Sequence, residues 1–255
     1  LDKDGKIDKI DSTQNNIFAF LPTSVSSYKF PFIVNANFIT DAGRQNLHKD
    51  YIWNQWLFEE MPQHYMLWIA EIAKDGKYGL DFLKVVSKKA GGYDILSECY
   101  NKGMKAALES IAFLPQGSRL LKTSEALFDE TGLFECLDSD MLISYLETDG
   151  NHYASKNILS NSYAEYVSYL KSLSVYVFEK EQLVEFLKSS TFQNKHIVLE
   201  NSKLIEFLSV RYPVVSDREE TNDISWLRNL PFIYSEHNVL QCPTQLCFPD
   251  VQYVS

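Results

Sequence analysis

The sequence lacks the features that mark membrane proteins, secreted proteins and general nucleic-acid-binding proteins. It has no run of about 18 or more apolar residues, so we expect no membrane-spanning helix and no membrane partner. Its 24 Lys and Arg residues are outnumbered by 34 Asp and Glu residues. The resulting net charge of −10 argues against a nucleic-acid partner, since phosphate binding needs clustered basic residues. The first residues, LDKDGKIDKID, are polar and acidic, so we expect no signal peptide and a cytoplasmic protein.

Cysteine is also scarce, with four residues in 255: Cys99, Cys136, Cys242 and Cys247. A chain of this size can bury a core without disulfides, so we expect reduced thiols, as is usual in the cytoplasm. A zinc site at the close pair Cys242 and Cys247 would need two further Cys or His ligands. Only His237 is near, so we expect no metal site.

The common catalytic motifs are absent as well. Gly-x-x-x-x-Gly-Lys-Ser/Thr, His-Glu-x-x-His and Gly-x-Ser-x-Gly do not occur, and the five histidines are scattered singly. Adjacent carboxylates such as Glu59 and Glu60 would point about 100° apart on a helix, which suits a solvated surface better than acid–base catalysis. We therefore expect no catalytic site and no cofactor in this chain alone.

The start of the chain imitates part of an EF-hand calcium loop. Asp2, Asp4 and Asp8 have ligand spacing, Gly5 occupies the turn and Asp11 the final carboxylate position. The first ligand position precedes the chain, no incoming helix is present, and the last ligand is Asp rather than Glu. We therefore favour a charged turn over a calcium site.

The N-terminal part is predicted to form a small sheet followed by a long helix. Residues 17–21 and 32–39 have the apolar, β-branched and aromatic composition of strands. In the second of these segments, apolar side chains occupy the even-numbered positions, whereas Asn35 and Asn37 occupy odd-numbered ones. One face of this strand is therefore expected to be apolar, and the other to present two amides.

The rest of the chain is predicted to be mostly helical, which makes the fold α+β: a small sheet with packed helices, followed by a helix-rich part. Pro62 is expected to kink or break the first helix near residue 61. We expect one α+β domain over residues 1–92, a helix-rich domain over 93–255, and an exposed linker at 211–223. Helices are predicted at about 46–74, 93–109, 138–147, 161–172, 180–189 and 201–209, with strands near 174–178 and 195–199.

Two segments of the helix-rich part resemble each other. Residues 111–129 and 230–250 each contain an apolar strand, a short polar turn, a second strand and a small turn that closes on Leu-Phe or Leu-Cys-Phe. Each segment follows an amphipathic stretch. The offset from residue 111 to residue 230 is 119 and is constant along the match. We interpret the segments as two copies of a helix–hairpin unit.

The sequence TDAGR at residues 40–44 looks like half of the Asp-x-Gly-x-Gly motif of ATP-binding domains. The second glycine of that motif is replaced by Gln45, and only strands and loops are predicted before Asp41. We therefore expect a strand-to-helix turn here and no nucleotide pocket, with Gly43 supplying the backbone freedom.

The order of motifs around this turn resembles the segment that follows the Hsp90-like (GHKL, histidine kinase-like) ATPase domain in sacsin-type proteins. The two hairpin segments are more loosely similar to hairpins in the same relatives, whereas residues 132–225 match no known segment. Relatives often have two basic residues where this chain has Arg44 followed by Gln45. The matching residues are Phe20 to Pro22, Pro31 to Asn35, Thr40 to Arg44 and Asp50 to Asn54.

This resemblance implies a transducer-like middle region of an ATPase whose nucleotide domain lies upstream of Leu1, and a start at Leu rather than Met agrees with it. ATP and Mg²⁺ would bind to the upstream domain. In this class a basic side chain of the following domain reaches the γ-phosphate in trans, and Arg44 holds that position here. Asn35, Asn37 and Gln45 would form the docking surface between the domains. The implied partners are the upstream domain and an unidentified client protein.

Other interpretations are open at this point. Arg44 could be a surface arginine that pairs with Asp41 or Asp50. The chain could also be a stand-alone interaction module, in which the two helix–hairpin units bind a partner without any dependence on nucleotide. A metal-dependent hydrolase or nuclease with dispersed acidic residues is a third and weaker alternative.

Overall fold

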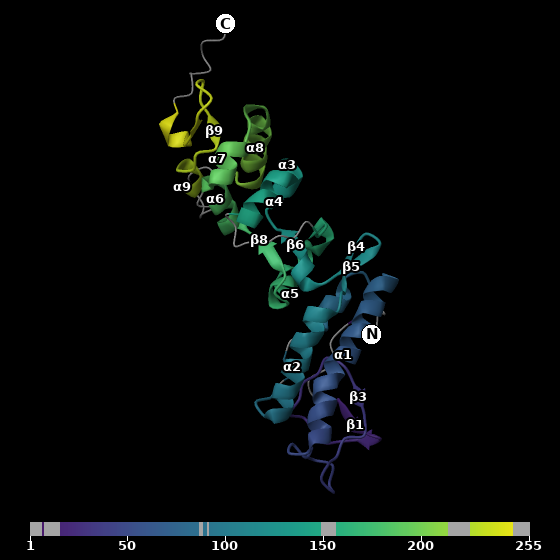
Figure 1. Cartoon of the computed structure of the whole chain (residues 1–255). Helices are drawn as coiled ribbons and strands as arrows, with labels where there is room; N and C mark the ends of the chain where they lie inside the picture. The colour runs from purple at the N-terminus through teal and green to yellow at the C-terminus, as the bar shows by residue number, and fades with distance from the viewer. Residues whose placement is uncertain are drawn as a thin grey trace. The chain divides into compact units, whose positions relative to one another are not determined.

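The computed structural model has the predicted α+β class, with helices and several small sheets (Figure 1). The chain divides into two compact units. The first contains Leu1–Ala126 and Leu159–Tyr176, and the second contains Leu127–Ile158 and Val177–Ser255. Within the described part of the chain, no helix is long and apolar enough to cross a membrane. The structure describes residues 7, 16–86, 89–90, 92–148, 157–213 and 225–246.

The first unit contains a three-stranded sheet, two long helices and a hairpin. The strand order is β2-β1-β3, with β1 antiparallel to β2 and parallel to β3. The predicted first strand is divided at Phe20, whose φ of 63° is left-handed, and the second is shorter than predicted. The elements are β1 (Ile17–Ala19), β2 (Leu21–Pro22), β3 (Val34–Asn35), α1 (Ile52–Asp75), η1 (Asp81–Lys84), α2 (Ile95–Ser110), β4 (Leu114–Gln116), β5 (Arg119–Leu121), η2 (Thr123–Glu125), η3 (Asn161–Tyr166) and α5 (Val167–Ser172).

Helices α1 and α2 lie side by side and form the core of this unit (Figure 1). Helix α1 buries Phe58, Tyr65 and Ile69 at spacings of seven and four residues, which places them on one face. On α2, Gly103 lies against the backbone of α1, because a Cβ atom added there would be 2.0 Å from the carbonyl oxygen of Glu59. The missing side chain thus sets how closely the helices approach. Since α1 and α2 share one core, the expected boundary after residue 92 does not coincide with the division into units.

The long helix differs from its prediction at its start and in its middle. It begins at Ile52 instead of residue 46, because the preceding residues are held in a turn described below. It continues through Pro62, so of the predicted kink or break, the break is wrong. Pro62 is buried on the core-facing side of the helix, where packing offsets the lost backbone hydrogen bond. The helix ends at Asp75 and is capped by Gly76, whose left-handed φ of 69° lets its N–H reach the carbonyl oxygen of Ile72.

The second unit is mostly helical and includes a small sheet of order β7-β6-β8. The predicted helices near 138–147, 180–189 and 201–209 correspond to α4, α6 and α8. The predicted strand at 195–199 is wrong, because these residues join two helices. The elements are β6 (Ala126–Asp129), α3 (Leu133–Cys136), α4 (Ser139–Thr148), β7 (Asn157–Ile158), β8 (Tyr176–Phe178), α6 (Lys180–Lys188), α7 (Ser190–Lys195), α8 (Val198–Arg211), α9 (Ser225–Arg228), β9 (Ile233–Tyr234), β10 (Leu240–Gln241) and η4 (Pro243–Gln245).

The two similar segments do form similar hairpins, each followed by a short 3₁₀ turn. In the first turn the Lys122 N–H donates to Glu125 Oε2 at 3.0 Å. In the second the Cys242 N–H donates to Gln245 Oε1 at 3.2 Å. The constant offset is wrong beyond the first strand, however. Leu114 pairs with Leu121 and Ile233 with Gln241, so the offset rises from 119 (233 − 114) to 120 (241 − 121) because the second loop is one residue longer.

Some predictions fall partly or wholly outside the described residues. The EF-hand-like aspartates Asp2, Asp4, Asp8 and Asp11 lie there, as does most of the expected linker at 211–223. Among the described residues, Cys99, Cys136 and Cys242 form no disulfide, and Cys247 lies outside the described part of the chain.

Replacement of Gly103 tests the close helix contact. We expect Gly103→Ala to lower the free energy of unfolding by about 2 kcal/mol or more, because the added methyl overlaps the Glu59 carbonyl. At an open helical position the same change is stabilising, by about 1 kcal/mol. Lys105→Ala, on an exposed position of the same helix, is the control and should change stability by less than about 0.5 kcal/mol. Urea denaturation measures both, and equal effects of the two variants would contradict the contact.

Candidate functional site

Residues 40–47 form a compact turn between the sheet and α1, here named the Arg44 turn. Thr40 and Leu47 form an antiparallel bridge across its base. Inside it, the carboxylate of Asp41 accepts hydrogen bonds from the Asn46 side chain at 2.9 Å and from the Gln45 N–H at 2.8 Å. These two bonds lower the pKa of Asp41, so the carboxylate is ionised and holds the turn at neutral pH. The predicted turn is therefore confirmed.

The prediction that Gly43 supplies the backbone freedom of this turn is wrong. The left-handed conformation belongs to the next residue, Arg44, whose φ is 55°. A Cβ atom added at Gly43 would find its nearest neighbour 3.7 Å away, in ordinary contact. Arg44 is held by its backbone, since its N–H donates to the Asp41 carbonyl at 3.0 Å and its carbonyl accepts from the Ser24 N–H at 2.9 Å. These bonds offset a left-handed strain of about 1 kcal/mol.

The side chains of Arg44 and Asn35 meet at a single peptide group. Nη1 of Arg44 donates to the carbonyl oxygen of Ala19 at 2.9 Å. Oδ1 of Asn35 accepts from the N–H of Phe20, the next residue, at 3.1 Å. The two side chains thus clamp opposite ends of the Ala19–Phe20 peptide. Phe20 itself is 76% exposed.

The remaining predicted site residues are nearby but play smaller parts. Asn37 is exposed, and its carbonyl oxygen accepts the indole N–H of Trp53 at 2.8 Å. Gln45 is exposed and joins the turn through its backbone. The predicted alternation is confirmed, since Ile33, Asn35 and Asn37 are all exposed. The structure therefore brings Arg44 and Asn35 together, and places Asn37 beside an exposed tryptophan.

A buried amide that the sequence analysis did not single out as a site residue fixes the Arg44 turn to the helix. Asn54, in the first turn of α1, is fully buried. Its Oδ1 accepts from the Ile39 N–H at 2.9 Å, and its Nδ2 donates to the carbonyl oxygens of Ile39 and His48 at 2.8 and 2.9 Å. Ile39 and His48 flank the turn on either side. The sequence signal was present, because Asn54 is a polar residue four positions before buried Phe58 on the same helical face.

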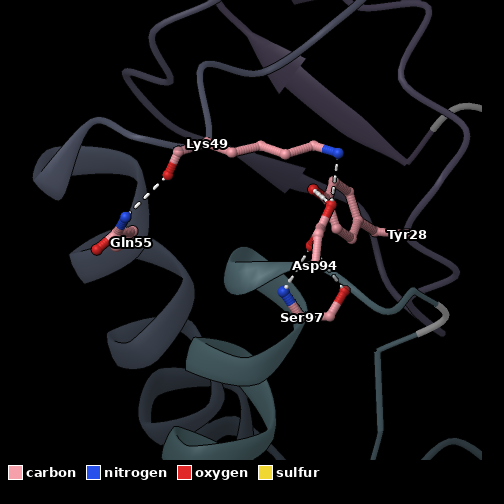
Figure 2. A network of polar contacts seen from close by, with 5 residues as sticks. All are labelled: Tyr28, Lys49, Gln55, Asp94 and Ser97. Atoms are coloured by element: carbon pink, nitrogen blue, oxygen red, sulfur yellow. Dashed lines mark hydrogen bonds and ion pairs between the residues drawn. The ribbon is translucent and has the colours of Figure 1, made fainter.

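A second polar network, centred on Asp94, binds Lys49, which follows the Arg44 turn in the sequence (Figure 2). The Asp94 carboxylate caps α2 by accepting from the Ser97 N–H at 3.0 Å. It also accepts from the Tyr28 hydroxyl at 2.7 Å and pairs with Lys49 Nζ at 2.9 Å. Burial by itself raises the pKa of Asp94, but the bonds from Ser97, Lys49 and Tyr28 outweigh it and lower the pKa to about 2. The network joins the loop at Tyr28, the segment before α1 and the start of α2.

Chemically, the Arg44 turn presents a fixed cation. A guanidinium group has five N–H donors, and within the described residues Arg44 uses one, toward Ala19, and pairs with neither Asp41 nor Asp50. In the described part of the chain, no three His, Cys, Asp or Glu side chains are grouped so that they could hold a metal ion. The arrangement is suited to binding an anion or docking another surface.

Comparison with known proteins gives one short similarity. Protein NO VEIN of Arabidopsis thaliana is 41% identical over 49 residues, which is 19% of this chain and 2% of that protein. The chain thus matches only a small part of the length of this relative. No protein-family model matches the chain, and no solved structure matches it.

Removal of the buried amide tests its role in the turn. We expect Asn54→Ala to lower the free energy of unfolding by about 2 kcal/mol or more, because three partly buried hydrogen bonds to the backbone of Ile39 and His48 would be lost. Gln55→Ala is the matched control, since Gln55 also donates to a backbone carbonyl, that of Lys49, but from a partly exposed position. Its cost should stay below about 1 kcal/mol. Similar losses in urea denaturation would show that Asn54 has no special role.

The Asp94 network predicts a pH dependence of definite sign. The pKa of about 2 lies below the ordinary 3.8, so the stabilisation is complete above about pH 4 and is lost as the pH falls through about 2. Asp94→Asn can still cap the helix but cannot ionise. Wild type should exceed this variant in unfolding free energy by about 1 kcal/mol or more at pH 6, with the difference shrinking between about pH 4 and pH 2. Denaturation curves at several pH values measure it, and a constant difference would contradict the ionic contribution.

Proposed function

We propose that this chain is the non-catalytic middle region of a sacsin-type, Hsp90-like ATPase. In this proposal an upstream nucleotide-binding domain, which would hold ATP and Mg²⁺, docks around the Arg44 turn. Its nucleotide state then controls the binding of a client protein. The similarity to a small part of NO VEIN is compatible with a chain that is one part of a long protein.

The observation that carries this proposal is the way Arg44 is held. Its backbone is fixed by bonds to Asp41 and Ser24, and its Nη1 by the Ala19 carbonyl. The remaining guanidinium donors have no partner among the described residues. A cation that is already positioned needs little reordering when an anion arrives, so it stabilises developing negative charge efficiently. A γ-phosphate presented by a neighbouring domain is such an anion.

The surroundings of Arg44 supply a surface for docking. Phe20 and Asn35 are exposed beside it, Ile33 is exposed two residues before Asn35 in the sequence, and Asn37 is joined to Trp53 by a hydrogen bond. The rings of Trp53 and Trp56 lie 5.1 Å apart, and about half of each residue is exposed. Exposed Trp and Arg residues are frequent energetic centres of protein interfaces.

The same tryptophan pair supports a second candidate function, a stand-alone interaction module. Such a module would use Trp53, Trp56 and the 81% exposed Ile52 to bind a partner directly. The two functions differ in one observable. For the middle region of an ATPase, the affinity for the partner differs between the ATP-bound and ADP-bound states of the protein. For a stand-alone interaction module, the affinity is the same whether ATP or ADP is present.

ATP hydrolysis by the full-length protein tests the role of Arg44. We expect Arg44→Gly to lower kcat at least about tenfold with little change in KM, because the cation acts on the transition state. Glycine is chosen because it accepts the left-handed conformation, so the fold is preserved. Arg44→Lys should retain part of the activity, since it keeps the charge.

The control is Arg119→Ala, which removes an exposed arginine of the β4–β5 hairpin and should leave kcat unchanged. Unchanged turnover in a folded Arg44→Gly variant would remove Arg44 from the mechanism. The coding sequence upstream of Leu1 provides a separate test. Without an upstream Glu-x-x-x-Asn helix and Asp-x-Gly-x-Gly motif, the coupling proposal fails and the interaction module remains.

A further inference from the structure

A groove in the first unit runs along the outer edge of β3. Its volume is about 810 Å³, within the range of pockets that bind small ligands. One wall consists of five consecutive residues, 31–35, so side chains of both strand faces border it and the backbone edge lies between them. The other wall is one face of α1, formed by Met61, His64, Tyr65, Trp68 and Ile72.

The backbone along this edge has unused hydrogen-bonding groups. Toward β1, the Val34 N–H donates to the Asn16 carbonyl at 2.8 Å and the Ala36 N–H to the Phe18 carbonyl at 3.1 Å. Alternate residues of a strand direct their N–H and C=O to opposite sides, so those of Ile33 and Asn35 face away from β1. Because β3 is the edge of its sheet, these groups make no hydrogen bond with any described residue.

The walls of the groove favour uncharged, apolar side chains. None of its lining residues is Asp, Glu, Lys or Arg, although the chain as a whole carries a net charge of −10. Phe32 and Tyr65 stack with ring centroids 4.1 Å apart, and Trp68 is 54% exposed. Ile7 of this chain lies buried against the groove, which shows that an aliphatic side chain fits there.

We propose that this groove binds an extended, uncharged peptide segment of a partner protein, which adds to β3 as a further strand. The backbone of the peptide satisfies the outward N–H and C=O groups of Ile33 and Asn35. Its alternate aliphatic side chains pack against Tyr65 and Trp68. Strand addition requires a strand edge without a partner next to an apolar helix face, and among the described residues the edge of β3 has this arrangement. A second copy of the chain is a poorer occupant, because it offers only the same short edge.

Two substitutions of Asn35 distinguish the contribution of its backbone N–H to peptide binding from the contribution of its side chain. Asn35→Pro removes the outward N–H and leaves the bonds of Val34 and Ala36 to β1, as edge strands tolerate. Asn35→Ala loses the same amide side chain but keeps the N–H. The probe is a fluorescently labelled, acetylated and amidated peptide of alternating threonine and isoleucine, and binding to the full chain is followed by anisotropy. Asn35→Pro should bind it about tenfold more weakly than Asn35→Ala, with equal melting temperatures confirming that both variants fold.

A second comparison changes the peptide instead of the protein. N-methylation of the threonines or of the isoleucines blocks the N–H groups along one edge of the peptide at a time. Strand addition requires that one of the two methylated peptides loses affinity and the other keeps it. The proposal is overturned if the parent peptide does not bind wild type, if both methylated peptides bind equally well, or if the two Asn35 variants bind alike. Concentration-dependent dimerisation that Asn35→Pro abolishes would also overturn it, by making a second copy the occupant.

Discussion

The buried amide of Asn54 is the constraint on which the candidate site depends. An amide without partners in the interior costs about 1–3 kcal/mol, so it must be satisfied by nearby backbone groups. Here those groups belong to Ile39 and His48, which flank the Arg44 turn on either side. The amide therefore ties the sheet, the turn and the first helical turn of α1 into one piece. With the turn fixed, Arg44 reaches Ala19 and leaves its other donors at the surface.

Much of the site could be predicted from local sequence, and the rest depended on contacts between distant residues. The alternation around Asn35 and the turn at residues 40–44 follow from patterns of two to five residues, and both are present. The left-handed residue was misplaced on Gly43, because propensity favours glycine there, whereas hydrogen bonds to Asp41 and Ser24 impose that conformation on Arg44. The clamp on the Ala19–Phe20 peptide joins residues too far apart in sequence for any local pattern to reveal.

In the fold, too, the features set by local sequence could be predicted, whereas those set by contacts between distant residues could not. The two hairpins were predicted because each strand, turn and capped 3₁₀ turn leaves its own short pattern. The extra residue in the loop between β9 and β10 was not predicted, because the two segments were aligned without gaps. The predicted strand at 195–199 failed because Ile197 and Val198 have the composition of a strand, although they are only about half buried and begin a helix. The shared core of α1 and α2 was missed because Gly103, which would ordinarily weaken a helix, instead permits their contact.

We propose that the Arg44 turn responds to nucleotide bound on a neighbouring domain. Amide hydrogen exchange in the full-length protein tests it most directly, with residues 16–47 compared between a non-hydrolysable ATP analogue and ADP. We expect slower exchange at Phe20 and across residues 40–47 in the ATP-like state, and no nucleotide effect in the isolated chain. Identical exchange of these residues in both nucleotide states of the full-length protein would contradict it.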